Sequence, residues 1–152
     1  MTTTNFQSKG PEQGKAFDEQ CRLILRELGF EVGDRPFRLR EAGIEIDAEM
    51  KSPAGEVYWA EFKGSWLGQR PGSRRTDTVK KAIADAFLVH FVHPDIKMLL
   101  LTSHLPKRDS DGHQMLRKTL ETGALFDVIN VNDPEDLERL REIADKEPDA
   151  SS

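Results

Sequence analysis

Two extended segments joined by a turn constrain the fold of this chain most strongly. In GIEIDAEM (43–50) apolar and acidic residues alternate strictly, so a strand places them on opposite faces: Ile44, Ile46, Ala48 and Met50 against Glu45, Asp47 and Glu49. The Pro and Gly of KSPAGE (51–56) favour a turn, and EVYWAEFK then supplies a partner strand. The pattern predicts a hairpin, and a turn-compatible register sets Asp47 opposite Glu61 and Glu49 opposite Trp59.

Helical periodicity before and after the hairpin predicts the remaining elements. Apolar stripes indicate helices over 14–28 (ended by Gly29), 76–90 (capped by Thr76, with Phe87 and His90 on its stripe), 112–122 and 134–145. Apolar runs indicate strands over 96–103 and 125–131, and residues 30–32 and 37–40 are read either as short strands or as extended loop. The order α-β-β-α-β-α-β-α predicts an α/β fold, a mixed sheet flanked by helices.

Length and composition fit one domain spanning 1–152, with flexible polar tails at 1–10 and 146–152. The sequence has neither an apolar run long enough to cross a bilayer nor the layout of a secretory signal at its start. Its single cysteine, Cys21, cannot form an internal disulfide, which favours a reducing, cytoplasmic location. One cysteine and four scattered histidines do not make a zinc-site pattern.

The charge distribution separates one segment from the rest of the chain. The net charge is −5, yet residues 63–81 contain six Lys and Arg against one acid, Asp77. The local field decides where a polyanion docks, so this segment is a candidate nucleic-acid contact. A solvated basic loop would show the same composition.

The end of the second hairpin strand combines an acid and a lysine. Glu61 and Lys63 are two residues apart and point to the same face of a strand. Opposed to Asp47, they would bring two carboxylates and an ammonium to one patch, and two facing carboxylates repel unless a cation lies between them. Mg²⁺ prefers such oxygen ligands, and a neighbouring lysine suits phosphodiester hydrolysis. An ordinary surface salt bridge gives the same acid-x-lysine spacing.

Residues 14–81 resemble the core of the PD-(D/E)XK nuclease superfamily. The resemblance rests on the order of four features: a first helix that runs from GKAFDEQ to ELGFEV, the segment GIEID, a turn, and the segment WAEFKGS. The resemblance implies a restriction-endonuclease-like fold, in which Asp47 and Glu61 bind metal with the Phe62 carbonyl and Lys63 is the catalytic lysine. This chain has Ile46 where the superfamily's name-giving motif has proline.

Many members of that superfamily add an acid from the first helix, which here is Asp18 or Glu19. Asp18 lies at the edge of the apolar stripe and is favoured as a catalytic residue. Glu19 falls on the wetter side with Arg22 and Arg26, and the choice between the two acids stays open.

The resemblance implies a Mg²⁺-dependent DNA endonuclease of resolvase, repair, phage or restriction type, with Mn²⁺ as a substitute. A homodimer is an open alternative to a monomer, since cutting two strands needs two sites. Expected DNA contacts are Arg70, Arg74, Arg75, Lys80 and Lys81 on phosphates, with Lys80 and Lys81 adding to an anion site at a helix N-terminus, and Trp66 stacking on a base or anchoring its loop. Two other functions remain open: a non-catalytic DNA-binding or assembly module, and an acidic protein-interaction regulator.

Overall fold

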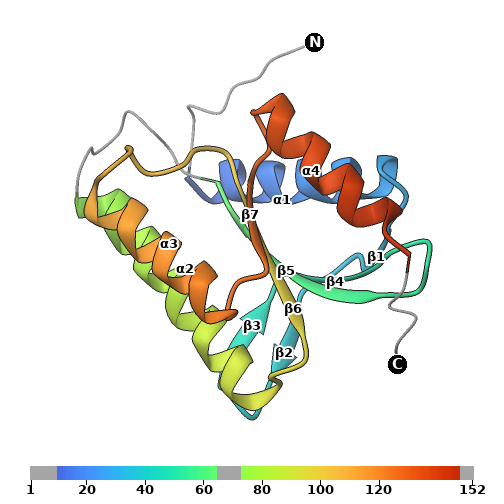
Figure 1. Cartoon of the computed structure of the whole chain (residues 1–152), viewed down its shortest axis with the longest axis horizontal. Coiled ribbons are helices and arrows are strands. Elements are labelled where there is room, and N and C mark those ends of the chain that lie inside the picture. The colour runs from blue at the N-terminus through green and yellow to red at the C-terminus, as the bar shows by residue number, and fades with distance from the viewer. Residues whose placement is uncertain (1–9, 65–72, 148–152) are drawn as a thin grey trace.

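The computed structural model describes residues 10–64 and 73–147, which form a mixed sheet with helices on both faces (Figure 1). The helices are α1 (Gly10–Glu27), α2 (Ser73–Val92), α3 (Asp111–Thr122) and α4 (Pro134–Asp145). The strands are β1 (Glu31–Val32), β2 (Phe37–Leu39), β3 (Ile44–Ile46), β4 (Ala48–Lys51), β5 (Val57–Lys63), β6 (Lys97–Thr102) and β7 (Asp127–Asn130). The α/β class and the predicted order of the main elements are confirmed. The expected tails lie almost entirely outside the described residues.

The main sheet has the order β1-β4-β5-β6-β7. Strands β4 and β5 form the predicted antiparallel hairpin, and its register pairs Glu49 with Trp59, as expected. The ladder ends at the Ala48–Ala60 pair, so the expected pair of Asp47 with Glu61 is not part of it. Gly55 has a φ of +96° in the turn, a conformation that a side chain disfavours. Strands β6 and β7 then add in parallel to β5, each after a helix.

The expected single strand over 43–50 is divided in two by a bend at Asp47. Strand β3 pairs with β2 in a separate two-stranded sheet, whereas β4 pairs with β5 and β1. Ile46 packs with Trp59 on the α2 side of the main sheet, whereas Ala48 and Met50 pack on the α1 side. The prediction of one apolar face was therefore wrong, because the strict alternation of a strand ends where the backbone bends.

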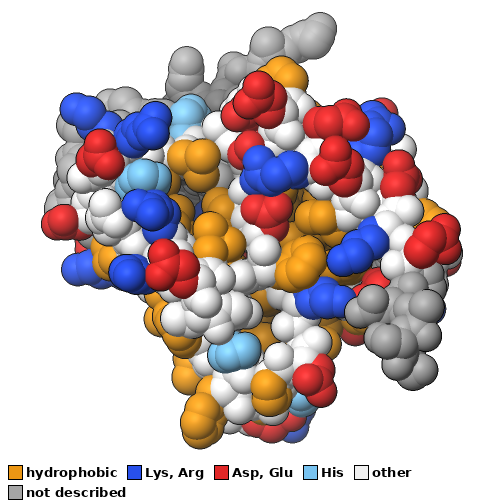
Figure 2. Space-filling model, viewed as in Figure 1, with side chains coloured by type: hydrophobic (Ala, Val, Ile, Leu, Met, Phe, Trp, Pro, Cys, Tyr) orange, Lys and Arg blue, Asp and Glu red, His pale blue; other side chains and the backbone are white. Residues whose placement is uncertain are grey.

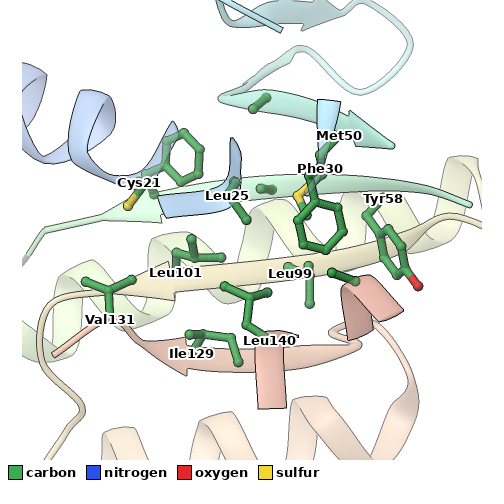
Figure 3. Close-up of a cluster of buried hydrophobic side chains, with 14 of the residues drawn as sticks. Cys21, Leu25, Phe30, Met50, Tyr58, Leu99, Leu101, Ile129, Val131 and Leu140 are labelled. Atoms are coloured by element: carbon green, nitrogen blue, oxygen red, sulfur yellow. The ribbon is translucent and has the colours of Figure 1, made fainter. Parts of the chain in front are cut away.

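Helices α1 and α4 cover one face of the main sheet. Figure 3 shows Cys21 and Leu25 of α1 and Leu140 of α4 pointing toward Leu99 and Leu101 of β6. All five side chains have 0% exposure. The apolar stripe predicted over 14–28 is thus the buried face of α1, and it fixes the helix across the sheet.

Helices α2 and α3 cover the opposite face, beside the small β2–β3 sheet (Figure 1). Ala82, Ala86 and Val89 are the buried positions of α2. The helix begins at Ser73, three residues earlier than predicted, so Thr76 lies inside it and is not its cap. Phe87, expected on the apolar stripe, is 41% exposed on the outer surface.

Two helix ends follow their sequence signals. The side chain of Asp133 accepts a hydrogen bond from the N–H of Glu135, and Pro134 opens α4. Gly123, with φ +86°, ends α3 as predicted. None of the helices in the described part of the chain combines the length and apolarity that a bilayer crossing requires.

Replacing Leu99 with alanine should lower the free energy of unfolding by about 2–5 kcal/mol, because a fully buried leucine leaves a cavity between β6 and its neighbours. Leu23→Ala, at a 59% exposed position on α1, should change it by less than about 0.5 kcal/mol. Urea unfolding followed by circular dichroism measures both. Equal losses in the two variants would contradict this description of the core.

Candidate active site

The structure brings Asp47, Glu61 and Lys63 together at the end of the β4–β5 hairpin. Glu61 and Lys63 lie on the α2-facing side of β5, and the Lys63 Nζ is 3.9 Å from the Glu61 Oε2. The Asp47 Oδ2 accepts a 2.8 Å hydrogen bond from the backbone N–H of Phe62. The three side chains that the sequence singled out therefore share one patch, although they come from two strands.

The bend at Asp47 explains how its carboxylate reaches β5. The β4–β5 ladder ends at the Ala48–Ala60 pair, so the next N–H on that side of β5, from Phe62, lies beyond the last pair of the ladder. The carboxylate of Asp47 accepts a hydrogen bond from this Phe62 N–H. In a strand the N–H and C=O of one residue point toward the same neighbour, so the Phe62 carbonyl faces the same side as Asp47.

Glu61 is the most unusual acid in this part of the chain. It is only 3% exposed, and its Oε1 has no hydrogen-bond partner among the described residues. The pKa of Glu61 is raised to about 9, first by burial and then by the neighbouring acid Asp47; Lys63 opposes this rise and Asp85 adds to it. Without a cation, the protonated form of this carboxyl is therefore favoured at neutral pH.

Two further acids of the patch, Asp47 and Asp18, are also destabilised in their charged forms. Burial raises the pKa of Asp47, against the Phe62 N–H and Lys63, which lower it. Asp18 on α1 is half-buried, and its pKa rises to about 6, first through burial and then through Asp47. Glu19 is exposed. Of the two helix acids considered, Asp18 lies at the patch and Glu19 faces solvent.

Arg22 holds the backbone at the bend, a role that the sequence did not suggest. Its Nη2 donates to the Asp47 carbonyl at 2.7 Å and its Nε donates to the Gly33 carbonyl at 3.1 Å. Its guanidinium lies 5.3 Å from the centre of the Phe62 ring. Arg22 is 8% exposed, so its assignment to the wetter side of the helix was wrong. Its position four residues after Asp18, on one helix face, was the available signal.

Asp85 is the second residue that sequence analysis missed. It lies on α2 between the buried positions Ala82 and Val89, and its carboxyl interacts with Glu61. In the sequence, Asp85 is the one Asp, Glu, Lys or Arg between Ala82 and Val92. A single acid within an apolar helical segment was therefore a readable indication of a buried polar contact.

The donor set fits a hard divalent cation. Mg²⁺ is held by one or two carboxylates, with water and phosphate oxygens completing its shell. Asp47, Glu61 and the Phe62 carbonyl offer such oxygens, and the unpartnered Glu61 Oε1 lacks the stabilisation that a cation would give. Among the described residues, no group of three or more His, Cys, Asp or Glu side chains could by itself hold a metal ion. A cation bound here would therefore need further ligands from water or substrate.

Lys63 also borders a small cavity of about 30 Å³ between α2 and the end of β6. That volume is enough for one water molecule. Thr102 also lines this cavity, and its Oγ1 donates a 2.9 Å hydrogen bond to the Lys63 carbonyl. The lysine is thus fixed at its backbone and has room for water beside it.

The expected DNA contacts are distributed over two regions. Arg70 and Trp66 lie outside the described residues, and Arg74 and Arg75 lie in the first turn of α2. Lys80 and Lys81 are exposed but begin two turns after the start of α2. The expected place of Lys80 and Lys81 in the first turns of this helix is therefore wrong, because the helix starts at Ser73, and their contact with phosphate stays a prediction.

Comparisons with known proteins give two distant likenesses. No protein-family model matches the chain, and no curated protein matches it. A solved structure of an EndoMS–dsDNA2 complex is 14% identical with a TM-score of 0.45, covering 83% of this chain and 47% of that one. A repair endonuclease from Pyrococcus abyssi is 16% identical with a TM-score of 0.41, covering 83% and 48%. This chain spans about half the length of either, and likenesses this distant assign no activity to it.

Glu61→Gln should stabilise the protein at pH 7–8 in the presence of a chelator, by about 3–5 kcal/mol, since each pH unit above the unfolded pKa costs about 1.4 kcal/mol. The folded state holds the Glu61 proton up to pH of about 9, whereas the unfolded chain releases it near 4.5. Stability is therefore lost as pH rises through this window, and the amide removes that loss.

Urea unfolding from pH 5 to 9 measures the effect, with Glu31→Gln at an exposed sheet position as the control. A pH dependence that is the same in both variants would show that Glu61 is not protonated in the folded state.

Proposed function

We propose that this chain is a Mg²⁺-dependent endonuclease that hydrolyses DNA phosphodiester bonds by attack of water. The observation that carries the proposal is the convergence of Asp47, Glu61 and Lys63, with a Glu61 oxygen buried and unpartnered. Burying a carboxylate beside other acids costs stability, so an ion that reverses the cost explains the arrangement. The order of the three residues along the hairpin also fits the PD-(D/E)XK pattern.

Asp47, Glu61 and the Phe62 carbonyl would hold the cation, with Mn²⁺ as a substitute for Mg²⁺. When bound, the metal would lower the pKa of water and offset charge on the phosphate. Cation binding would also favour the charged form of Glu61, which the folded protein otherwise disfavours at neutral pH.

Lys63 would position the attacking water and stabilise the negative charge that develops on the phosphate. Its Nζ, close to Glu61, lies on the same side of β5 as the acids, and its side chain is 22% exposed, so substrate can reach it. Asp18 lies within the electrostatic reach of Asp47 and would complete the acidic wall of the site on the α1 side. Arg22 would act as a positioning residue through the Asp47 backbone.

A digestion panel tests the activity and the substrate together. Linear duplex, flap, four-way junction, single strand and RNA are incubated with Mg²⁺, with Mn²⁺ and with chelator. Metal-dependent cleavage of at least one DNA substrate, leaving 5′-phosphate ends, is expected. If none is cut but salt-sensitive DNA binding remains, a non-catalytic binding module replaces the proposal.

Lys63→Ala should reduce cleavage by at least about 100-fold, because the group that positions water and offsets charge is removed. The fold and most of the DNA affinity should remain. Lys51→Ala, at an exposed position of the neighbouring strand β4, is the matched control and should cleave normally. Single-turnover rates with pre-bound DNA measure the chemical step, and a fully active Lys63→Ala protein would remove the lysine from the mechanism.

Replacing both Arg74 and Arg75 with alanine should weaken DNA binding equally for all sequences, because contacts with phosphates do not read bases. Loss of two phosphate contacts should reduce the slope of log affinity against log salt by about 2. Fluorescence anisotropy at several salt concentrations measures that slope. A slope equal to that of the unmodified protein would exclude both residues from the DNA interface.

A further inference from the structure

The C-terminal half of α2 is apolar on nearly all of its sides. Between Ala82 and Val92, Asp85 is the one Asp, Glu, Lys or Arg, and its carboxyl interacts with Glu61 of the active site. The inner face of the helix packs on the sheet. The outer face carries Ala84, Phe87, Leu88 and Phe91, which are all exposed.

The exposure of this outer face is large for a protein surface. Phe87 is 41% exposed, Leu88 is 40% exposed and Phe91 is 85% exposed. In Figure 2 hydrophobic side chains reach the surface along the lower left edge of the molecule, where Figure 1 places α2. A helix that is apolar all round is normally buried, and a contiguous exposed patch of this kind marks an interaction site. The exposed Leu23 of α1 differs, since the residues three and four positions away on its helix face, Glu19, Gln20, Arg26 and Glu27, are all polar.

We propose that the outer face of α2 is a homodimer interface, in which α2 packs antiparallel against α2 of a second copy. Positions 84, 87, 88 and 91 follow helical spacing and are symmetric about a point between Phe87 and Leu88. A two-fold axis at that point brings Ala84 of each copy opposite Phe91 of the other. The small residue leaves room for the large ring, so the stripe is complementary to itself, as a two-fold interface requires.

The charges at the two ends of the stripe support the antiparallel pairing with a second copy over another partner. Lys80 and Lys81 lie about two turns before the axis and are exposed. The other end of the stripe is acidic: Asp95 is exposed just beyond α2, and Glu41 lies there with its Oε2 3.4 Å from the His93 Nε2. The two-fold axis therefore places the basic end of the stripe in one copy against the acidic end of the stripe in the other, and this contact occurs twice per dimer.

The interface lies on the side of α2 opposite the candidate active site. Asp85 and the buried alanines face the sheet, whereas Phe91 points directly away from it. Both active sites of the dimer would thus stay open. Dimerisation does not depend on metal or DNA, so it can fail or hold independently of the nuclease proposal.

Sedimentation velocity over a concentration series tests the association. The unmodified chain should sediment as a dimer. Phe91→Glu should raise the dimer dissociation constant by at least about 100-fold, because two-fold symmetry places the substitution in the interface twice and each copy loses a buried ring. Leu23→Glu, at an exposed apolar position on α1, should remain dimeric. Circular dichroism checks that both variants keep their helices.

A charge exchange tests the antiparallel geometry. Lys80→Glu and Asp95→Lys should each weaken self-association, since each sets like charges against one another. A mixture of the two variants should restore a dimer containing one copy of each, because both contacts across the axis then pair opposite charges. Isotope or mass labelling of one variant identifies that heterodimer.

A monomeric unmodified chain would overturn the proposal, as would a dimer that Phe91→Glu leaves intact. A dimer that Phe91→Glu disrupts, but that the mixed charge variants do not restore, would overturn the antiparallel pairing. The nuclease assays are scored separately. Metal-dependent cleavage by a monomer would reject the interface and retain the enzyme.

Discussion

The hydrogen bond between the Asp47 carboxylate and the Phe62 N–H is the contact on which the candidate site depends. It forms where the β4–β5 ladder ends, so a side chain takes the position of the next backbone partner. The same bond directs the Asp47 carboxylate toward Glu61 and Lys63 and leaves the Phe62 carbonyl beside it. Arg22, bonded to the Asp47 carbonyl from α1, keeps the bend in place. A local interruption of a strand thereby creates a cluster of oxygen atoms.

That cluster is costly for the folded chain by itself. Three acids have raised pKa values largely because they are buried, and Glu61 has an oxygen without a partner. Proteins retain such destabilising groups mainly where a ligand or reaction needs them. Here the arrangement would be relieved by a divalent cation, which binds carboxylates and reverses the sign of their mutual interaction. The electrostatic cost is therefore consistent with the proposed metal-dependent hydrolysis.

Helix α2 links the two proposals through its opposite faces. Its inner face brings Asp85 to Glu61 and packs small residues against the sheet, which allows the helix to approach closely. Its outer face carries the exposed aromatic and aliphatic side chains of Phe87, Leu88 and Phe91, which no described residue covers. A single helix would then connect the acid cluster of one copy with the contact between two copies. The basic residues near its start lie on the same element as both features.

The sequence by itself predicted the hairpin, the pairing of Glu49 with Trp59 and the order of the main helices and strands, and it singled out Asp47, Glu61 and Lys63 as one possible patch. These features follow from short-range periodicity, turn residues and cross-strand pairing. The tertiary structure decided the bend at Asp47, the burial of Arg22, the approach of Asp85 and the exposure of Phe87. Each depends on which residue from a distant segment occupies a given place, and periodicity within one segment contains no such information. A helical pattern gives the faces of a helix, but only packing determines which face meets the sheet.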